Sequence, residues 1–448
     1  MSLAWRFLYR LYRNYSSLRH WAERRFSRAG LMVAGALLVA GMMGPDTDNN
    51  VTYQAFTLLL CLVLVAVSFS AFFGGKFSVQ RQLPRFGSVG CPLQYRVTVK
   101  NLGRKTQRGL VLLEGLADAR ASFSDWRAAQ LGLAEQIRSF PVSQGRRLHP
   151  FRVATVNEAI LPPIHANEQV EAKIELTPQR RGVLRFDHVT LARPDPLGLF
   201  RAFCNVPLAQ TTLILPKRYP LPALALPGTM KYQEGGVALA SNVGQSEEFV
   251  ALRDYRHGDP FRHIHWRTWA RAGKPVVKEF EDEFFVRHAL VLDTFTQPSH
   301  NEVFEEAVSV AASFASSIQT QESLLDLLFV GPQSYCFTSG RGLAHTDQML
   351  EILASVRVCA DKPFRTLEHL VFNHVKVVSG CICVLVAWDQ ERRDFVRKLR
   401  SLGVPVMVLL IVPAGQSRLM ESGPLQAELG ELHLLEAGSI EAGLAKLR

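Results

Sequence analysis

Cysteine is scarce in this chain, and its spacing matches no disulfide framework and no C-x-x-C motif. The seven cysteines of the 448-residue sequence are Cys61, Cys91, Cys204, Cys336, Cys359, Cys381 and Cys383, and no C-x-x-C motif occurs. An odd number without framework spacing excludes a disulfide scaffold and predicts a reducing compartment. Cys381 and Cys383, two positions apart in an apolar stretch, are predicted to be small core residues on one face of a strand.

Enzyme signatures are missing as well. The sequence contains no G-x-S-x-G, no H-E-x-x-H, no Walker loop and no dinucleotide-binding glycine pattern. These absences favour a protein that is not an enzyme. The alternatives are an envelope-associated hydrolase, which requires a deep pocket around His257, His265 and neighbouring acids, and a metal-dependent binding protein.

Charge is absent from two stretches, Ala29–Gly44 with sixteen residues and Val51–Phe73 with twenty-three. A helix that spans a bilayer needs about twenty apolar residues, with a lower limit near seventeen. The second stretch predicts a transmembrane helix. The first, extended by Phe26, predicts its partner, so residues 29–73 are expected to form a membrane hairpin. A signal peptide is the alternative for the first stretch.

The charges that flank the hairpin predict its orientation. Residues 1–28 carry seven arginines and one glutamate, whereas the connector Pro45–Asn50 has two aspartates and no basic residue. Lys76, Arg81 and Arg85 follow the second stretch. By the positive-inside rule both ends face the cytoplasm. We therefore expect a two-pass protein of a bacterial inner membrane with cytoplasmic soluble domains.

The basic tail, residues 1–28, places aromatic residues among its arginines and is either an interfacial amphipathic helix or a plain juxtamembrane tail. It holds +6 of the formal net charge of +11, which leaves +5 on the rest of the chain. This distribution favours a membrane surface as partner and argues against nucleic acid.

Periodicity divides the remainder of the chain. Residues 77–215 alternate apolar and polar side chains, as in Leu93–Val99, and predict a β-sandwich domain of immunoglobulin-like type. Residues 216–243, rich in proline and glycine, predict a linker. In residues 286–448 short buried strands alternate with helical stripes, which predicts a doubly wound α/β domain.

The segment between linker and last domain, residues 244–285, mixes charged and aromatic side chains. Asp259 suits a helix N-cap and Pro260 the first helical position, so we predict a helix over 260–272 that ends at Gly273. Its predicted buried stripe consists of Phe261, Ile264, His265, Trp269 and Ala272.

The same segment resembles a known family. Its pattern E-F-x-x-L-R-x-Y-x-x-G-D-x-x-R-x-I-x-W-x-x-x-A-R, followed by V-V-K-x-F-E, is similar to the hallmark of the domain-of-unknown-function 58 family. Arg181-Gly182 and the D-P-x-G-L-F of residues 195–200 are also similar to that family, and turn chemistry alone explains them. His265 departs from the family's usual Asp. The signature residues expected to mediate interaction are Arg253, Tyr255, Gly258, Asp259, Arg262, Trp266, Arg271, Lys278 and Glu281.

The resemblance implies a partner. Such proteins typically accompany MoxR-type AAA+ ATPases, and their von Willebrand factor A-like part is thought to bridge ATPase and target. We therefore expect a membrane-anchored, non-catalytic scaffold in the assembly or maturation of envelope or other complexes. The signature segment is either the partner surface or an intramolecular clasp that joins domains. In the clasp, three arginines pair with four acids: Arg253, Arg262 and Arg271 with Asp254, Asp259, Glu279 and Glu281.

The element order of residues 286–448 itself resembles a von Willebrand factor A domain, a family that binds a divalent cation through D-x-S-x-S, a Thr and a later Asp. Here Asp293 opens the motif, but Phe295 and Gln297 replace both hydroxyls. The candidate cation ligands are Asp293, Thr346 and Asp389, and no other cofactor is expected. The alternative is that the two aspartates cap neighbouring helices.

Overall fold

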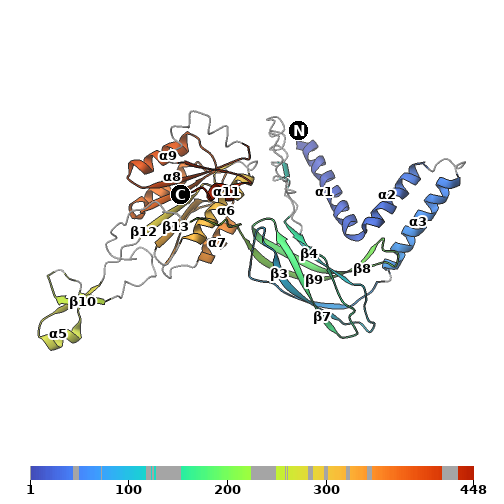
Figure 1. Cartoon of the computed structure of the whole chain (residues 1–448), viewed down its shortest axis with the longest axis horizontal. Coiled ribbons are helices and arrows are strands. Elements are labelled where there is room, and N and C mark those ends of the chain that lie inside the picture. Colours follow the sequence, from blue (N-terminus) through green and yellow to red (C-terminus); the bar gives the residue numbers. More distant parts are fainter. Residues whose placement is uncertain are drawn as a thin grey trace. The chain divides into compact units, whose positions relative to one another are not determined.

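The computed structural model describes residues 2–43, 50–71, 73–117, 123, 126–127, 153–222, 249–257, 259, 261–280, 286–296, 301–318, 323–340, 346–415 and 432–447. The chain divides into two compact units, Met1–Lys217 and Arg218–Arg448. The expected multidomain organisation is confirmed, and each unit is described by itself (Figure 1).

Three helices open the first unit: α1 (Ser2–Arg25), α2 (Arg28–Met43) and α3 (Asn50–Ala71). Within the described residues, one helical segment is long and apolar enough to cross a bilayer, Val51–Ser70 in α3. The apolar α2 has 16 residues and is shorter than the usual span. A Cβ on Gly41 of α2 would lie 3.4 Å from the ring of Phe56 in α3, so the two helices pack together. Of the two predicted spans, the second therefore meets the length requirement, and α2 lies beside it.

Two sheets follow and form a sandwich. The first has the order β1 (Phe77–Gln82), β3 (Leu93–Asn101), β7 (Gln169–Pro178), β5 (Ala154–Val156). The second has the order β2 (Phe86–Ser88), β9 (Arg201–Leu215), β8 (Gly182–Pro194), β4 (Val111–Leu116), β6 (Ala159–Ile160). All pairings are antiparallel except β2 with β9.

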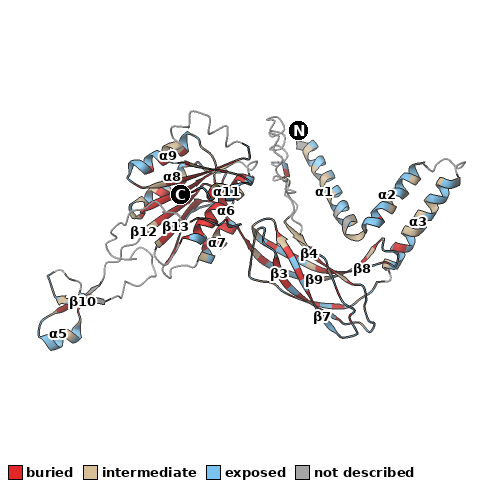
Figure 2. Cartoon of the chain, viewed as in Figure 1, coloured by how far each residue is buried: buried red, intermediate tan, exposed pale blue. Residues whose placement is uncertain are grey.

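Alternation along the strands builds the sandwich core. In β3 every second side chain is buried, as Figure 2 shows, and Val97 belongs to one buried cluster with Ile174, Phe186 and Leu191. The alternation of residues predicts two strands here, Val183–Phe186 and Val189–Ala192, but the structure has one strand, β8, with an irregularity between Phe186 and His188. The longest strand, β9, was not predicted, and Pro207 lies within it. A proline is tolerated there since it pairs with His188 at that irregularity.

A mixed six-stranded sheet forms most of the second unit. Its order is β14 (Ser334–Ser339), β13 (Ser323–Val330), β12 (Val286–Leu292), β15 (Gly380–Leu385), β16 (Val406–Val412), β17 (Leu432–Glu436). The pairings are parallel except for the edge strand β14. The helices are α6 (Asn301–Ser317), α7 (Thr346–Ser355), α8 (Arg365–His374), η3 (Val375–Val377), α9 (Gln390–Ser401) and α11 (Ile440–Leu444).

Helices cover both faces of this sheet (Figure 1). Leu367 of α8 and Phe395 of α9 pack in one cluster with Val291, Cys383 and Val408, while α6 lies on the other face. Cys381 and Cys383 are buried, with their Sγ atoms 3.5 Å apart, so their prediction as core residues on one strand face is confirmed. The predicted alternation of strands and helices is present, although α8 and β17 were not predicted.

A separate antiparallel hairpin carries the signature segment. It consists of β10 (Phe249–Asp254), β11 (Val276–Phe280), a 3₁₀ turn η1 (Phe261–His263) and α5 (Trp266–Ala272).

Candidate functional site

The hairpin 249–280 is held by a small apolar centre and a charged turn. Ile264 forms a bridge to Val277, and both are buried together with Val276. In the turn, Arg253 Nη1 and Nη2 donate to the two carboxylate oxygens of Asp259 at 2.7 and 2.8 Å. The backbone N–H of Arg256 donates to the same carboxylate at 2.8 Å. Arg253 and Asp259 therefore fix the loop that precedes α5.

This pairing explains why the helix begins later than predicted. The predicted helix over 260–272 is wrong at its start, because α5 begins at Trp266 and residues 261–263 form a 3₁₀ turn. Asp259 does not cap the helix, since its carboxylate accepts from Arg253 and Arg256. His265 is the N-cap residue instead. The predicted end is confirmed, since Gly273 adopts φ 68° and its N–H bonds to the carbonyl of Trp269.

The predicted buried stripe is only partly present. Ile264 is buried, but Phe261 is 73% exposed. Seven residues make two turns that pack on β11 along one side, which leaves the other sides in water. Trp266 is 62% exposed and stacks on Trp269, with ring centroids 5.1 Å apart and planes at 20°. Helix α5 therefore exposes aromatic side chains on one side and the basic Arg267 and Arg271 on another.

Other signature residues lie around this face. Tyr255 stacks on Phe261 at 6.3 Å, and Lys278 is half-buried in β11. Gly258, Glu281 and the side chain of Arg262 lie outside the described residues. The pairs Arg253–Asp259 and Lys274–Asp254 both join residues of the hairpin to each other. These two pairs therefore shape the hairpin itself.

We expect the turn to respond to pH through Asp259. The hydrogen bond from Arg253, with that from the Arg256 N–H, lowers the pKa of Asp259 from 3.8 to about 2. Because the folded pKa is the lower one, the pair stabilises the turn fully above about pH 4, and this contribution is lost as the pH falls toward 2. The ¹³C shift of the Asp259 carboxyl should titrate near pH 2, and in Arg253→Gln nearer 4. A wild-type midpoint near 4 contradicts the pairing.

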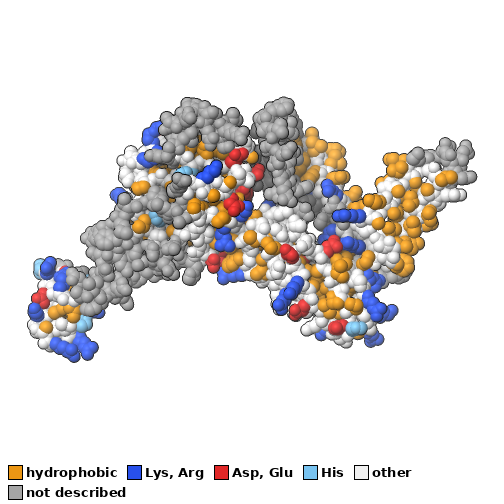
Figure 3. Space-filling model, in the orientation of Figure 1, with side chains coloured by type: hydrophobic (Ala, Val, Ile, Leu, Met, Phe, Trp, Pro, Cys, Tyr) orange, Lys and Arg blue, Asp and Glu red, His pale blue; other side chains and the backbone are white. Residues whose placement is uncertain are grey.

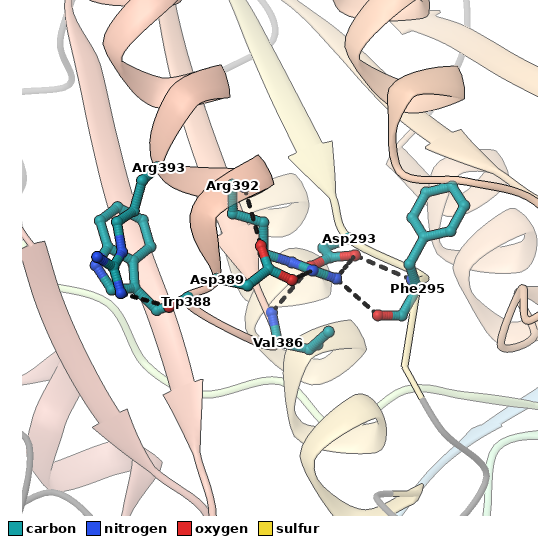
Figure 4. Close-up of polar contacts among 7 residues, drawn as sticks. All are labelled: Asp293, Phe295, Val386, Trp388, Asp389, Arg392 and Arg393. Atoms are coloured by element: carbon teal, nitrogen blue, oxygen red, sulfur yellow. Dashed lines mark hydrogen bonds and ion pairs between the residues drawn. The ribbon is translucent and has the colours of Figure 1, made fainter.

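A second cluster lies at the carboxyl ends of β12 and β15 (Figure 4). The Arg392 guanidinium of α9 donates to Asp293 from Nε at 2.6 Å and from Nη2 at 3.2 Å. It also donates to Asp389 Oδ2 at 2.5 Å and to the Phe295 carbonyl at 2.7 Å. The guanidinium lies over the Phe364 ring, 4.8 Å from its centroid. The two predicted aspartates are thus brought together around an arginine.

The electrostatics of this cluster are those of a buried ion pair. Burial raises the pKa of Asp293, while Arg392 and the N–H groups of Phe295 and Val386 oppose that rise. Burial alone would lower the pKa of Arg392, but the carboxylates of Asp293 and Asp389 outweigh it. The Arg392 guanidinium lies between the two aspartates. It therefore places there the positive charge that a bound cation would otherwise provide.

The donor set does not fit a cation while Arg392 is in place. Thr346 begins α7 and makes none of the contacts of Asp293 or Asp389 in the described part of the chain. Asp389 Oδ1 accepts from the Arg392 N–H at 3.0 Å and caps α9, which is the alternative predicted for it. The cation site at Asp293, Thr346 and Asp389 stays a prediction, and magnesium binding to Arg392 variants tests it below.

The D-P-x-G-L-F loop has a further role that the sequence did not reveal. Asp195 accepts from the N–H groups of Leu197 and Phe200 at 2.9 and 2.7 Å, which is the expected turn chemistry. The loop also receives α2: the Ser27 N–H donates to the Leu199 carbonyl at 3.1 Å. A Cβ on Gly30 would lie 2.0 Å from that carbonyl oxygen, so Gly30 permits the contact.

These features define a class: a multidomain chain with an apolar helical hairpin, a β-sandwich, a mixed α/β sheet and a separate aromatic, basic hairpin. The family model described as "Protein of unknown function DUF58" matches residues 251–428, which confirms the resemblance to the domain-of-unknown-function 58 family.

Comparison with known proteins adds one relative. The chain is 30% identical over 193 residues to "Uncharacterized protein YeaD" of Bacillus subtilis (strain 168), across 42% of this chain and 46% of that protein. The match therefore spans less than half the length of the relative. Among solved structures, a CARDB domain from Pyrococcus furiosus aligns at 12% identity over 31% of this chain and 93% of that chain, with a TM-score of 0.17. A β-glucosidase from Listeria innocua aligns at 15% identity over 31% and 16% of the two chains, also at 0.17.

Proposed function

We propose that this chain is a membrane-anchored, non-catalytic docking protein whose hairpin 249–280 binds a protein partner. The observation that carries the proposal is the exposed surface of the short helix α5, which presents the stacked pair Trp266–Trp269 on one side and Arg267 and Arg271 on another. Tryptophan and arginine dominate the binding energy of protein interfaces. The Arg253–Asp259 pair fixes the turn that carries this face, which lowers the entropy lost on binding.

The face selects a partner by its chemistry. Exposed Arg256, Arg267 and Arg271 fit an acidic surface, and Trp266 fits an apolar pocket within it. The family resemblance supplies the class of partner, a MoxR-type AAA+ ATPase. In this proposal the α/β sheet is a von Willebrand factor A-like domain that bridges the ATPase and its target. Two features support a von Willebrand factor A-like domain: the parallel sheet with an antiparallel edge strand, and the position of Asp293 directly after β12.

The anchor in this proposal is the α2–α3 pair. Exposed Lys76 and Arg85 follow α3, while the arginines of α1 precede α2. Arg81 does not add to this surface charge, because it is buried. The basic flanks support a two-pass arrangement in a bacterial inner membrane, with both soluble units in the cytoplasm.

Capture from detergent-solubilised membranes tests the proposal. We expect the wild-type chain to enrich an AAA+ ATPase in the presence of ATP. The variant Trp266→Ala should weaken binding by about 2 kcal/mol, roughly 30-fold in Kd, because truncating a central anchor costs that much. Titration of the purified ATPase against each variant measures the change.

A matched control uses exposed residues elsewhere in the same unit. Leu402 is exposed, and the Arg397 side chain is 66% exposed on α9. The double variant Arg397→Ala, Leu402→Ala should bind like wild type, whereas Arg271→Ala, Trp266→Ala should not. If the hairpin variant captures the ATPase as well as the control does, the hairpin is not the docking surface.

A further inference from the structure

Helix α1 presents three distinct stripes along its length. Trp5, Tyr9, Tyr12 and Ser16 share one side, because they are three or four residues apart. Arg6, Arg10 and Arg13 form a second stripe, and all three are exposed. The third stripe is apolar and exposed, and consists of Phe7, Leu8, Leu11, Tyr15 and Leu18.

The first stripe packs against a single tryptophan of the same unit. Trp126, from the connection between β4 and β5, is buried under the α1 aromatics. Its ring centroid lies 5.9 Å from that of Trp5, 5.5 Å from Tyr9 and 5.7 Å from Tyr12. Three ring contacts on one tryptophan fix the rotation of α1 about its own axis.

The C-terminal end of α1 is fastened to the sandwich. Arg24 donates to Thr190 Oγ1 at 3.4 Å, and the Arg25 guanidinium lies 4.9 Å from the Phe203 ring centroid. Phe26 then packs against Phe200 at 5.0 Å. These contacts hold the C-terminal end of α1 on the sandwich, while the aromatic side faces Trp126 and the apolar stripe stays exposed.

The exposed apolar stripe suits a lipid interface. Leu18 is 63% exposed and Tyr15 is 67% exposed. Polar residues are usual at such positions on a helix that faces only water. The arginine stripe runs beside it, and the helix contains one acid, Glu23. Phosphate groups of anionic lipids complement such an arginine stripe, while the acyl boundary accommodates the apolar one.

The neighbouring helices point to the same occupant. Helix α2 begins three residues after α1 ends, and α3 contains the segment that is long and apolar enough to span a bilayer. Figure 3 shows hydrophobic side chains gathered over α2 and α3. An anionic membrane surface is therefore available within a few residues of α1 if the anchor spans the bilayer.

We propose that α1 lies in the headgroup layer of an anionic bilayer, with its Phe7–Leu18 stripe inserted and Arg6, Arg10 and Arg13 on lipid phosphates. The proposal rests on the membrane anchor of the proposed function. In this arrangement the C-terminal end of α1 joins the sandwich to the lipid surface through Arg24, Arg25 and Phe26, so the sandwich is held at the membrane.

Site-specific fluorescence on the full chain tests this. The accessible Cys61, Cys91, Cys204 and Cys336 are replaced by serine, and single labels with an environment-sensitive dye are placed by Leu18→Cys or Ser17→Cys. Ser17 is the matched control, because it is also exposed and lies on the side of α1 that carries the arginine stripe. A third protein keeps Cys61 of α3 as its single labelled site. All are reconstituted in phosphatidylcholine–phosphatidylglycerol vesicles and in pure phosphatidylcholine.

We expect the label at 18 to emit at shorter wavelength in the mixed vesicles and to be quenched several-fold more by a headgroup nitroxide than the label at 17. The label at 17 should respond to a water-soluble nickel chelate. Replacing Arg6, Arg10 and Arg13 with glutamine should return the emission at 18 to its value in pure phosphatidylcholine.

Other outcomes separate this inference from the anchor. If Cys61 is quenched by lipid nitroxide while the label at 18 behaves as in water, the anchor stands and the inference is overturned. If the label at 18 is shielded from both quenchers, a protein surface covers the stripe and the inference is again overturned. If Cys61 itself stays in water, the anchor of the proposed function fails, and the label at 18 still reports directly on α1.

Discussion

Replacing Arg392 with methionine should lower the free energy of unfolding of the α/β unit by about 3–5 kcal/mol, the typical cost of removing one partner from a buried ion pair. Asp293 is fully buried and would lose the two hydrogen bonds that Arg392 donates to it. The Phe295 carbonyl would lose its bond from the same guanidinium. Hydrogen exchange of the β12 and β15 amides in the full chain measures the loss.

Two comparisons make this result specific. Arg397→Met, on the same helix, removes an exposed pair with Asp394 and should cost less than about 1 kcal/mol. The double variant Asp293→Asn, Arg392→Met should recover part of the loss, because the buried negative charge is then gone. A single Arg392→Met variant as stable as Arg397→Met would show that the pair does not stabilise the sheet.

The same position tests the predicted cation site. We expect no calorimetric magnesium binding by the wild-type chain, because the guanidinium lies between Asp293 and Asp389. In Arg392→Ala the two carboxylates are free to share a cation, so magnesium should restore part of the lost stability. Magnesium binding by wild type that Asp293→Ala abolishes would instead support the three-ligand site.

The second large effect is expected at Arg81, which joins the two sheets of the sandwich. Arg81 of β1 donates to both carboxylate oxygens of Glu114 in β4, at 3.1 and 2.5 Å, and both side chains are 0% exposed. It also donates to the Leu208 carbonyl in β9 and lies over the Phe186 ring. Arg81→Met should therefore cost about 3–5 kcal/mol, since it leaves Glu114 buried and unpaired.

A neighbouring strand offers the control. Arg96 of β3 pairs with Glu171 at 3.7 Å, and both side chains are more than 60% exposed. Arg96→Met should change the exchange of β3 amides little, whereas Arg81→Met should accelerate it strongly. The double variant Arg81→Met, Glu114→Leu should regain most of the stability, because an apolar pair of similar volume suits the same site. Failure to regain it would point to the Leu208 and Gln210 bonds as the main contribution.

The sequence predicted those features that depend on local chemistry. Gly273 ends α5 because a left-handed residue is needed there, and Asp389 begins α9 because its side chain reaches the Arg392 N–H. Features that depend on distant partners were missed. Asp259 was predicted to be the helix N-cap, but its carboxylate accepts hydrogen bonds from Arg253 instead. Arg392 was not predicted as part of the site, because only the folded sheet brings Asp293 within reach of it.

The same distinction applies to the strands and the aromatic residues. The alternation of apolar and polar residues predicts β3 and β7, whereas β9 was not predicted. Its Pro207 is accommodated by an irregularity in the partner strand β8, which the local sequence does not show. Phe261 was assigned to a buried stripe on helical spacing alone, but the helix does not reach it. Spacing predicts which side chains share a side, and only tertiary packing decides whether that side is covered.

The contact of Gly30 with the Leu199 carbonyl has a mechanical consequence. Helix α2 meets the β8–β9 loop without an intervening flexible segment, and the Ser27 hydrogen bond ties the same point. In the proposed membrane arrangement, a tilt of α2 would strain that loop and the long β8–β9 ribbon behind it. A change in bilayer thickness would then reach the sandwich as strain in this loop.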